Sequence, residues 1–145
     1  MEQNVIISIQ GKQSFPESEP EIIELVTEGK LEDRGEAGIV LSYQESEVTG
    51  LEGTLTTIQV EPRRVTLMRM GSVNSQMVFE EGRRHQSMYN TPYGALEIGL
   101  HTRKIRTSLD SRGGDVTIYY ALEIEHGAAG RNMFRINVRP ATLTQ

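Results

Sequence analysis

An alternation of apolar and polar residues with a period of two dominates the second half of the chain. In residues 115–125 the even-numbered positions are apolar, and the odd-numbered positions include Glu123 and Glu125. A helix would spread these apolar side chains around its circumference, whereas a strand places them all on one face. Residues 131–139 repeat the pattern, and residues 126–130 between them contain two glycines, which is typical of a turn. The two segments are therefore predicted to form a β-hairpin.

Shorter runs of the same kind fill the rest of the chain. Near Thr102 the apolar positions switch from even to odd numbers, which indicates a bulge, a bend or a break in the strand. The segment 21–31 comes nearest to an amphipathic helix, but its β-branched Ile22, Ile23 and Val26 favour a strand. Strands are predicted at residues 5–10, 21–31, 37–45, 54–61, 64–70, 75–80, 83–89, 95–101, 103–109, 115–125 and 131–139.

This succession of strands decides the predicted fold class. Strands that follow one another in sequence usually pair, so a run of short strands is typical of an up-and-down barrel or a sandwich. Closure into a barrel is favoured because it removes exposed strand edges. With 145 residues, the chain fits one domain spanning residues 1–145. We predict a single all-β domain, a closed antiparallel up-and-down barrel of about eight to ten strands.

The composition excludes several kinds of protein. The chain has no cysteine, so it forms neither a disulfide nor a thiolate metal site. No apolar run reaches the ~20 residues that a transmembrane helix requires. The N-terminal residues lack the basic and apolar regions of a signal peptide. We therefore expect no membrane insertion and a cytoplasmic location.

Charge is distributed unevenly along the chain, whose formal net charge is −5. Residues 1–61 carry 13 acidic and 3 basic side chains, whereas residues 62–145 carry 7 acidic and 12 basic ones. In one compact domain this places acidic strands beside basic strands, where opposite charges stabilise cross-strand pairs. The alternative is a basic face that contacts an anionic partner.

Four short motifs resemble those of a known family. They are Leu41-Ser42-Tyr43-Gln44-Glu45, Leu67-x-Arg69-x-Gly71, Thr91-Pro92-Tyr93-Gly94-x-Leu96-x-Ile98 and Gly114-x-Val116-x-Ile118-x-Tyr120. In order and spacing, over nearly the whole chain, they resemble the YwiB-like family of uncharacterised bacterial proteins. The resemblance implies a calycin-like barrel, the architecture of lipocalins and fatty-acid-binding proteins, and it implies no activity. The chain has no tryptophan, so it cannot carry the Gly-x-Trp signature of lipocalins.

The sequence contains no recognisable catalytic or metal-binding motif. His85, His101 and His126 are far apart and form neither an H-x-H nor an H-E-x-x-H arrangement. No serine lies in the Gly-x-Ser-x-Gly context of a nucleophile elbow. The glycine pairs have the composition of turns rather than of a phosphate-binding loop. We therefore expect no catalytic residue, no metal and no cofactor, and we do not predict an enzyme.

Arg69 is the most informative polar residue because its orientation is ambiguous. The strand 64–70 has apolar residues on both faces, so the sequence does not say which face is interior. An inward guanidinium needs a partner because an unpaired buried charge is costly. Glu45, in phase with Tyr43, is the candidate partner. Such an ion pair would fix the strand register. Alternatively, Arg69 points into water. In a third reading, Arg69 binds the carboxylate or phosphate of a ligand, as internal arginines do in fatty-acid-binding barrels.

These residues support three hypotheses of different kinds. The first is a non-enzymatic binding protein that holds a small amphipathic or acidic ligand, with Arg69, Glu45, Tyr43 and Tyr120 at the site. The second is an interaction protein that contacts RNA or an acidic protein through Arg103, Lys104, Arg106, Arg131, Arg135 and Arg139, although the overall acidity and the lack of aromatic RNA-binding motifs disfavour RNA. The third is an enzyme built from Tyr43, Glu45, Arg69, His101 and Tyr120. The oligomeric state stays open, and an apolar side chain such as Met133 would suit a homodimer.

Overall fold

The computed structural model describes residues 2–14, 21–45, 52–71, 74–91, 94–125 and 127–141. His126 and the Pro92-Tyr93 part of one family motif lie outside these residues. The described residues form ten strands and one short 3-10 helix, η1 (Gly35–Ala37). The strands are β1 (Glu2–Ser14), β2 (Glu21–Asp33), β3 (Ile39–Gln44), β4 (Thr54–Val60), β5 (Arg64–Gly71), β6 (Ser75–Glu80), β7 (Arg84–Thr91), β8 (Gly94–Thr107), β9 (Gly114–Ile124) and β10 (Gly127–Pro140).

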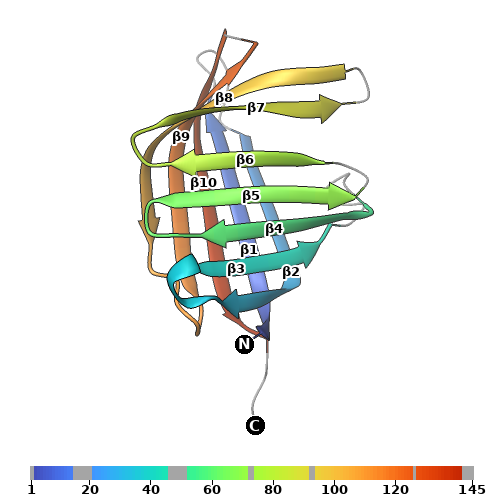
Figure 1. Ribbon diagram of the computed structural model, residues 1–145, viewed down its shortest axis with the longest axis vertical. Coiled ribbons are helices and arrows are strands. Elements are labelled where there is room, and N and C mark those ends of the chain that lie inside the picture. The colour runs from blue at the N-terminus through green and yellow to red at the C-terminus, as the bar shows by residue number, and fades with distance from the viewer. Residues whose placement is uncertain are drawn as a thin grey trace.

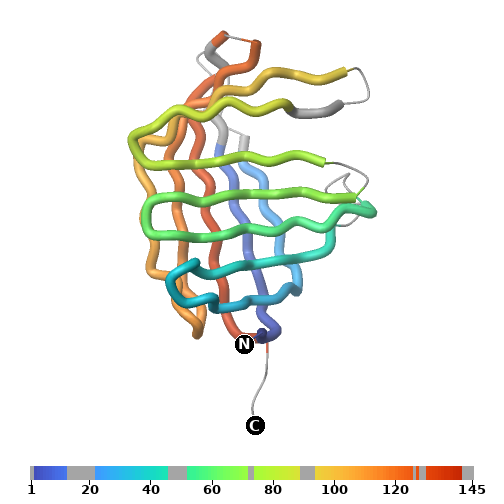
Figure 2. The backbone as a smooth tube through the Cα atoms, in the orientation of Figure 1, coloured from blue at the N-terminus to red at the C-terminus, as the bar shows by residue number. Residues whose placement is uncertain are grey.

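All ten strands belong to one antiparallel sheet with the order β6-β5-β4-β3-β2-β1-β10-β9-β8-β7. Every strand pairs with its sequence neighbour except β6 with β7, and β1 pairs with β10 to join the two ends of the chain. Strands β3 to β6 cross the long strands β1, β2, β9 and β10 at a steep angle (Figures 1 and 2). The sheet therefore curls into a nearly closed barrel, which confirms the predicted fold class.

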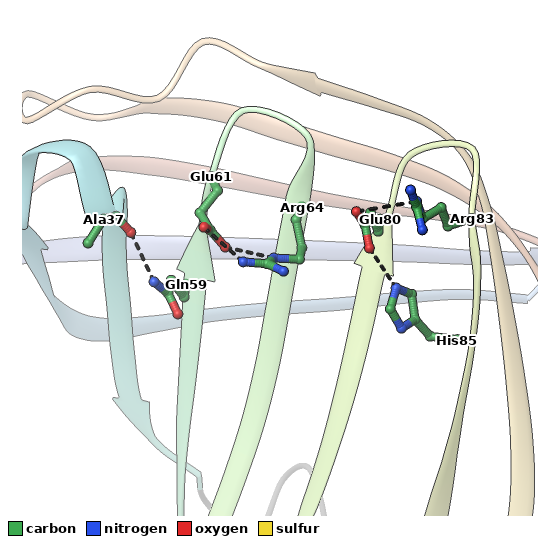
Figure 3. Close-up of polar contacts among 7 residues, drawn as sticks. All are labelled: Ala37, Gln59, Glu61, Arg64, Glu80, Arg83 and His85. Carbon is green, nitrogen blue, oxygen red and sulfur yellow. Dashed lines mark hydrogen bonds and ion pairs between the residues drawn. The ribbon is translucent and has the colours of Figure 1, made fainter.

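The barrel is interrupted between β6 and β7. These strands are the two ends of the sheet, and no ladder joins them in the described part of the chain. At their common turn, the Gly82 amide donates to the carbonyl of Thr102, and the Thr102 amide donates to that of Arg83. Glu80 accepts a hydrogen bond from His85 at 2.8 Å and pairs with Arg83 at 3.7 Å (Figure 3). These contacts fix the turn that connects β6 to β7, and the two strands diverge beyond it (Figure 1).

A tight corner between β2 and β3 starts the curl of the sheet. β2 pairs with β1 along almost its whole length, but it pairs with β3 only from Lys30 to Asp33. Just before this point is Gly29, where a Cβ atom would lie 2.5 Å from the carbonyl oxygen of Ser42. Only glycine lets the two backbones approach so closely.

The predicted alternation corresponds to the observed core. Val116 and Ile118 of β9 are fully buried, as is Ile136 of β10. Phe79 of β6 packs edge-on against Tyr120 of β9, with ring centroids 4.9 Å apart. Side chains from opposite walls of the barrel therefore meet in one core, which is what a period of two along each strand requires.

The switch of phase near Thr102 is a β-bulge within one continuous strand. The β8–β9 register shifts between Thr102 and Lys104, so Leu100 and Ile105 both face the core. The predicted break into two strands is thereby resolved in favour of a bulge. Bulges bend a strand while keeping its apolar side chains inside.

Several predicted strand boundaries were wrong. Residues 127–130 are not a turn, because β10 begins at Gly127 and the register with β9 shifts between Ala128 and Gly130. Glycine and alanine suggested a loop, but here they form a bulge in which Gly130 has a φ of 129°. Ala37 belongs to η1 rather than to β3. The strands β1, β2 and β10 also extend beyond the predicted apolar runs.

Candidate ligand cavity

A cavity of about 700 Å³ lies inside the barrel. Its walls come from strands on both sides of the interruption, and its apolar lining includes Leu25, Leu67, Met77, Phe79, Ile98 and Phe134. Pockets for small molecules in proteins typically measure roughly 300–1,000 Å³ and are lined mainly by apolar side chains. The cavity therefore has the size and the lining of a small-molecule site.

Glycine contributes to this space. Gly11 of β1 lines the cavity, and a Cβ atom placed there would meet no other heavy atom within 4 Å. It continues the inward-facing series of Ile7 and Ile9, where the alternation calls for a large apolar side chain. A glycine at this position leaves room that another residue would fill.

Arg69 points into the cavity, which settles the ambiguity of β5. Val65 and Leu67, on the same face of the strand, are buried, whereas Met68 and Met70 are exposed on the outside. The Arg69 side chain is 18% exposed, so it is largely enclosed without being sealed from solvent. The apolar residues on the outer face explain why the sequence alone did not distinguish the two faces.

Glu45 is the partner of Arg69, as the phase of its segment predicted. The Arg69 Nε lies 3.8 Å from Oε2 of Glu45, whose side chain is only 1% exposed. Thr56 donates a hydrogen bond to the same carboxylate oxygen. The backbone register explains the grouping, since Thr56 pairs directly with Tyr43 on one side and with Arg69 on the other.

Two tyrosines complete the polar part of the site. Burial raises the pKa of Tyr43, and the negative charge of Glu45 and its hydrogen bond raise that pKa further, against the opposing effects of Arg69 and Thr56. Burial also raises the pKa of Tyr120, although a hydrogen bond with Asn132 acts in the opposite direction. Both phenols are therefore neutral hydrogen-bonding groups at physiological pH.

The structure brings together all four predicted ligand-binding residues. Tyr43, Glu45, Arg69 and Tyr120 all line the cavity. His101, the remaining member of the enzyme hypothesis, is exposed and is not among the lining residues. The proposed catalytic group is thus incomplete among the described residues, because β8 directs His101 to its outer face.

Sequence reasoning missed two polar residues beside Arg69. Thr56 is fully buried and binds Glu45, and Ser75 of β6 is the cross-strand partner of Arg69. Their residue types did not indicate a place at the site, because threonine and serine are common in strands and turns. Only the register of β4, β5 and β6 places them next to the ion pair.

The described residues offer neither a cluster of metal ligands nor a membrane-spanning helix. This part of the chain contains no group of three or more His, Cys, Asp or Glu side chains placed to hold a metal ion. None of its helices is long and apolar enough to cross a membrane. His85, the second residue of β7, hydrogen-bonds Glu80 at the end of β6.

Comparison with known proteins identifies relatives but no activity. The model of the DUF1934 family, described as a domain of unknown function, matches residues 7–136. The chain is similar to an uncharacterized β-barrel protein, YwiB, of Bacillus subtilis (strain 168), with 29% identity over 86 residues; the match covers 59% of this chain and 59% of the relative. The matched segment spans less than two thirds of that relative's length. The crystal structure of ywiB protein from Bacillus subtilis superposes with a TM-score of 0.82 at 24% identity, covering 97% of this chain and 94% of the other.

Proposed function

The chain belongs to the DUF1934 family of domains of unknown function, and from this premise we propose that it is a non-enzymatic binding protein. Its ligand is a small amphipathic or acidic molecule held in the barrel interior. The apolar part contacts the walls, and the polar part lies at Tyr43, Glu45, Arg69 and Tyr120. Calycin-type proteins also hold ligands inside a barrel, so this part of the proposal is an analogy of fold. The cavity in this chain supports the analogy.

The cavity of about 700 Å³ carries the proposal. The cavity is accessible from solvent, and most of its lining is apolar. Apolar surface that remains in contact with water beside an enclosed ion pair is surface that a bound ligand would bury. Binding is favoured over catalysis because the lining is mainly apolar and the Glu45 carboxylate is paired with Arg69.

Native mass spectrometry of the protein purified from cells tests whether a small molecule is retained. A thermal-shift panel of alkyl amphipaths then tests binding directly, since a ligand at 100 times its Kd adds about 2.7 kcal/mol to stability. For a domain of this size that corresponds to a Tm increase of roughly 5–10 °C. No retained molecule and no shift across the panel would contradict the proposal.

Filling the cavity provides a matched pair of variants. Gly11→Phe places a ring in the space beside Gly11 and should abolish the thermal shifts while leaving the barrel folded. Gly11→Ala adds only a methyl group and should bind as the wild type does. Equal binding by both variants would show that the ligand does not occupy this cavity.

The role of Arg69 has a test of its own. Replacing one member of an enclosed ion pair normally destabilises a protein because the other charge is left unpaired. If Arg69→Met were more stable than the wild type and bound the same compounds equally well, Arg69 would not be part of a binding site.

A basic surface supports a second candidate function. Lys104 and Arg106 of β8 are exposed. Across the intervening strand β9, Lys104 is in register with Met133 of β10, and Arg106 is in register with Arg135. We propose as the alternative that this surface contacts RNA or an acidic protein. Phosphate contacts would make RNA affinity fall steeply with added salt. Lack of binding at low salt, or an affinity indifferent to salt, would remove this candidate.

A further inference from the structure

The charged side chains that line the cavity are balanced in sign. They are Lys12, Glu24, Glu45 and Arg69. Lys12 and Glu24 are exposed at the rim, where water screens them. Inside the rim, Arg69 and Glu45 lie 3.8 Å apart and cancel one another's charge. The interior therefore offers no net positive charge to an entering ligand.

Hydrogen-bonding capacity, in contrast, is left over. In the part of the chain that the structure describes, Arg69 Nε and Ser75 Oγ are buried atoms without a hydrogen-bond partner. These residues are direct cross-strand partners on β5 and β6. Arg69 lines the cavity, as do Met77 and Phe79 of β6, whereas Ser75 is not one of the lining residues. The separation of 3.8 Å between Arg69 and Glu45 exceeds hydrogen-bonding distance. Glu45 thus neutralises Arg69 without occupying its Nε donor.

Burial of a donor without an acceptor is costly, so this corner of the cavity is suited to a molecule that supplies an acceptor. We infer that the cavity selects amphipathic molecules whose polar end is an uncharged acceptor, such as an ester or amide carbonyl, over molecules that end in a free carboxylate. This inference rests on the proposed binding function and narrows its ligand class. A carbonyl oxygen can accept from the Arg69 guanidinium, which lines the cavity, without bringing a second negative charge.

A carboxylate would be disfavoured at the same place. To reach Arg69 it must approach Glu45, and two carboxylates that share one enclosed site repel each other strongly. Glu45 is not free to withdraw into water, because its side chain is 1% exposed and accepts a hydrogen bond from Thr56. The ion pair therefore disfavours a charged ligand, and the partly exposed Arg69 guanidinium is the group to which a carbonyl oxygen can bind.

Three probes with one alkyl chain test this selection: dodecanoic acid, methyl dodecanoate and dodecanamide. Affinities are measured at neutral pH by displacement of a fluorescent probe from the barrel, below the aggregation concentration of each compound. The ester and the amide should bind wild-type protein at least about tenfold more tightly than the acid, the factor that one charge-assisted hydrogen bond contributes.

Removal of the carboxylate of Glu45 should reverse the order. In Glu45→Gln the charge of Arg69 is no longer neutralised, and the acid should gain about tenfold and become the tightest ligand. Glu24→Gln removes the same charge at the exposed rim and is the matched control, with the wild-type order expected. If Glu45→Gln does not fold, the double variant Glu45→Gln with Arg69→Gln keeps the site neutral and should bind all three probes with similar affinity.

The outcomes separate this inference from the proposed function. Tighter binding of the acid than of the ester and the amide by the wild type would overturn the inference while the binding function stands. Equal binding of the three probes would also overturn it. If none of the probes binds the folded wild-type protein, the proposed function fails, and the inference fails with it.

Discussion

Replacement of Gly29 by alanine tests the corner that turns the sheet from β2 into β3. A Cβ atom at this position would lie 2.5 Å from the carbonyl oxygen of Ser42 and 2.5 Å from Cδ1 of Ile7. The backbone oxygen cannot move aside without disturbing the pairing of β3 with its neighbours. Overpacking of this kind typically costs about 1–3 kcal/mol, and we expect a value near the upper end. At roughly 2–4 °C per kcal/mol, the Tm should fall by roughly 6–12 °C.

Gly11→Ala is the matched control for this prediction. Gly11 lies on the adjacent strand and also faces the interior, but a Cβ atom there meets nothing within 4 Å. The substitution should leave stability unchanged or raise it by about 0.4–1 kcal/mol, because alanine has less conformational freedom in the unfolded chain. Urea denaturation followed by circular dichroism gives both free energies of unfolding. Equal stabilities of Gly29→Ala and Gly11→Ala would refute the reasoning, because it assigns them opposite surroundings.

Further predictions concern titration and packing. The raised pKa values of Tyr43 and Tyr120 mean that their contribution to stability is complete below pH 10.0 and is lost as the pH rises further. In a spectrophotometric titration, Tyr43→Phe and Tyr120→Phe should each remove a late-ionising phenol; loss of an early one would contradict the burial. The hydrogen bond from His85 lowers the pKa of Glu80 below 4.5, so the stability from Glu80 is present above pH 4.5 and declines as the pH falls below it. Glu80→Gln should flatten the acid side of the Tm profile, and an unchanged profile would argue against this contact. Ile118 is fully buried, so Ile118→Ala should cost about 2–5 kcal/mol in urea denaturation; a cost under about 1 kcal/mol would place Ile118 outside the core.

The grouping of polar side chains at the cavity depends on the register in which several strands pair. Thr56 pairs with Tyr43 and with Arg69, and Arg69 pairs in turn with Ser75. Four hairpin-connected strands, β3 to β6, therefore bring the carboxylate of Glu45 and its neighbours to one place. A shift of one residue in any of these pairings would turn the affected side chains to the outer face. The ion pair and the strand register consequently support each other.

The alternation of residues was sufficient to predict most of the fold. It located the strands, identified the buried face of β9 through Val116 and Ile118, and marked the bulge near Thr102. It did so because side chains on an extended backbone point to alternate sides, a local property that needs no tertiary contact. The same argument failed at Gly127 to Gly130, where small residues that suggest a turn form a bulge within β10.

The amino-acid pattern was enough to predict an all-β chain with Arg69 on one face of its strand and Glu45 in phase with Tyr43. It did not determine which face of β5 is interior, because Met68 and Met70 make the outer face apolar as well. The folded barrel shows that Arg69 points inward, that a cavity remains beside it, and that the ladder stops between β6 and β7. The physical reason is that a period of two assigns side chains to faces, whereas closure of a barrel depends on long-range pairing and on the total volume of the side chains that fill it.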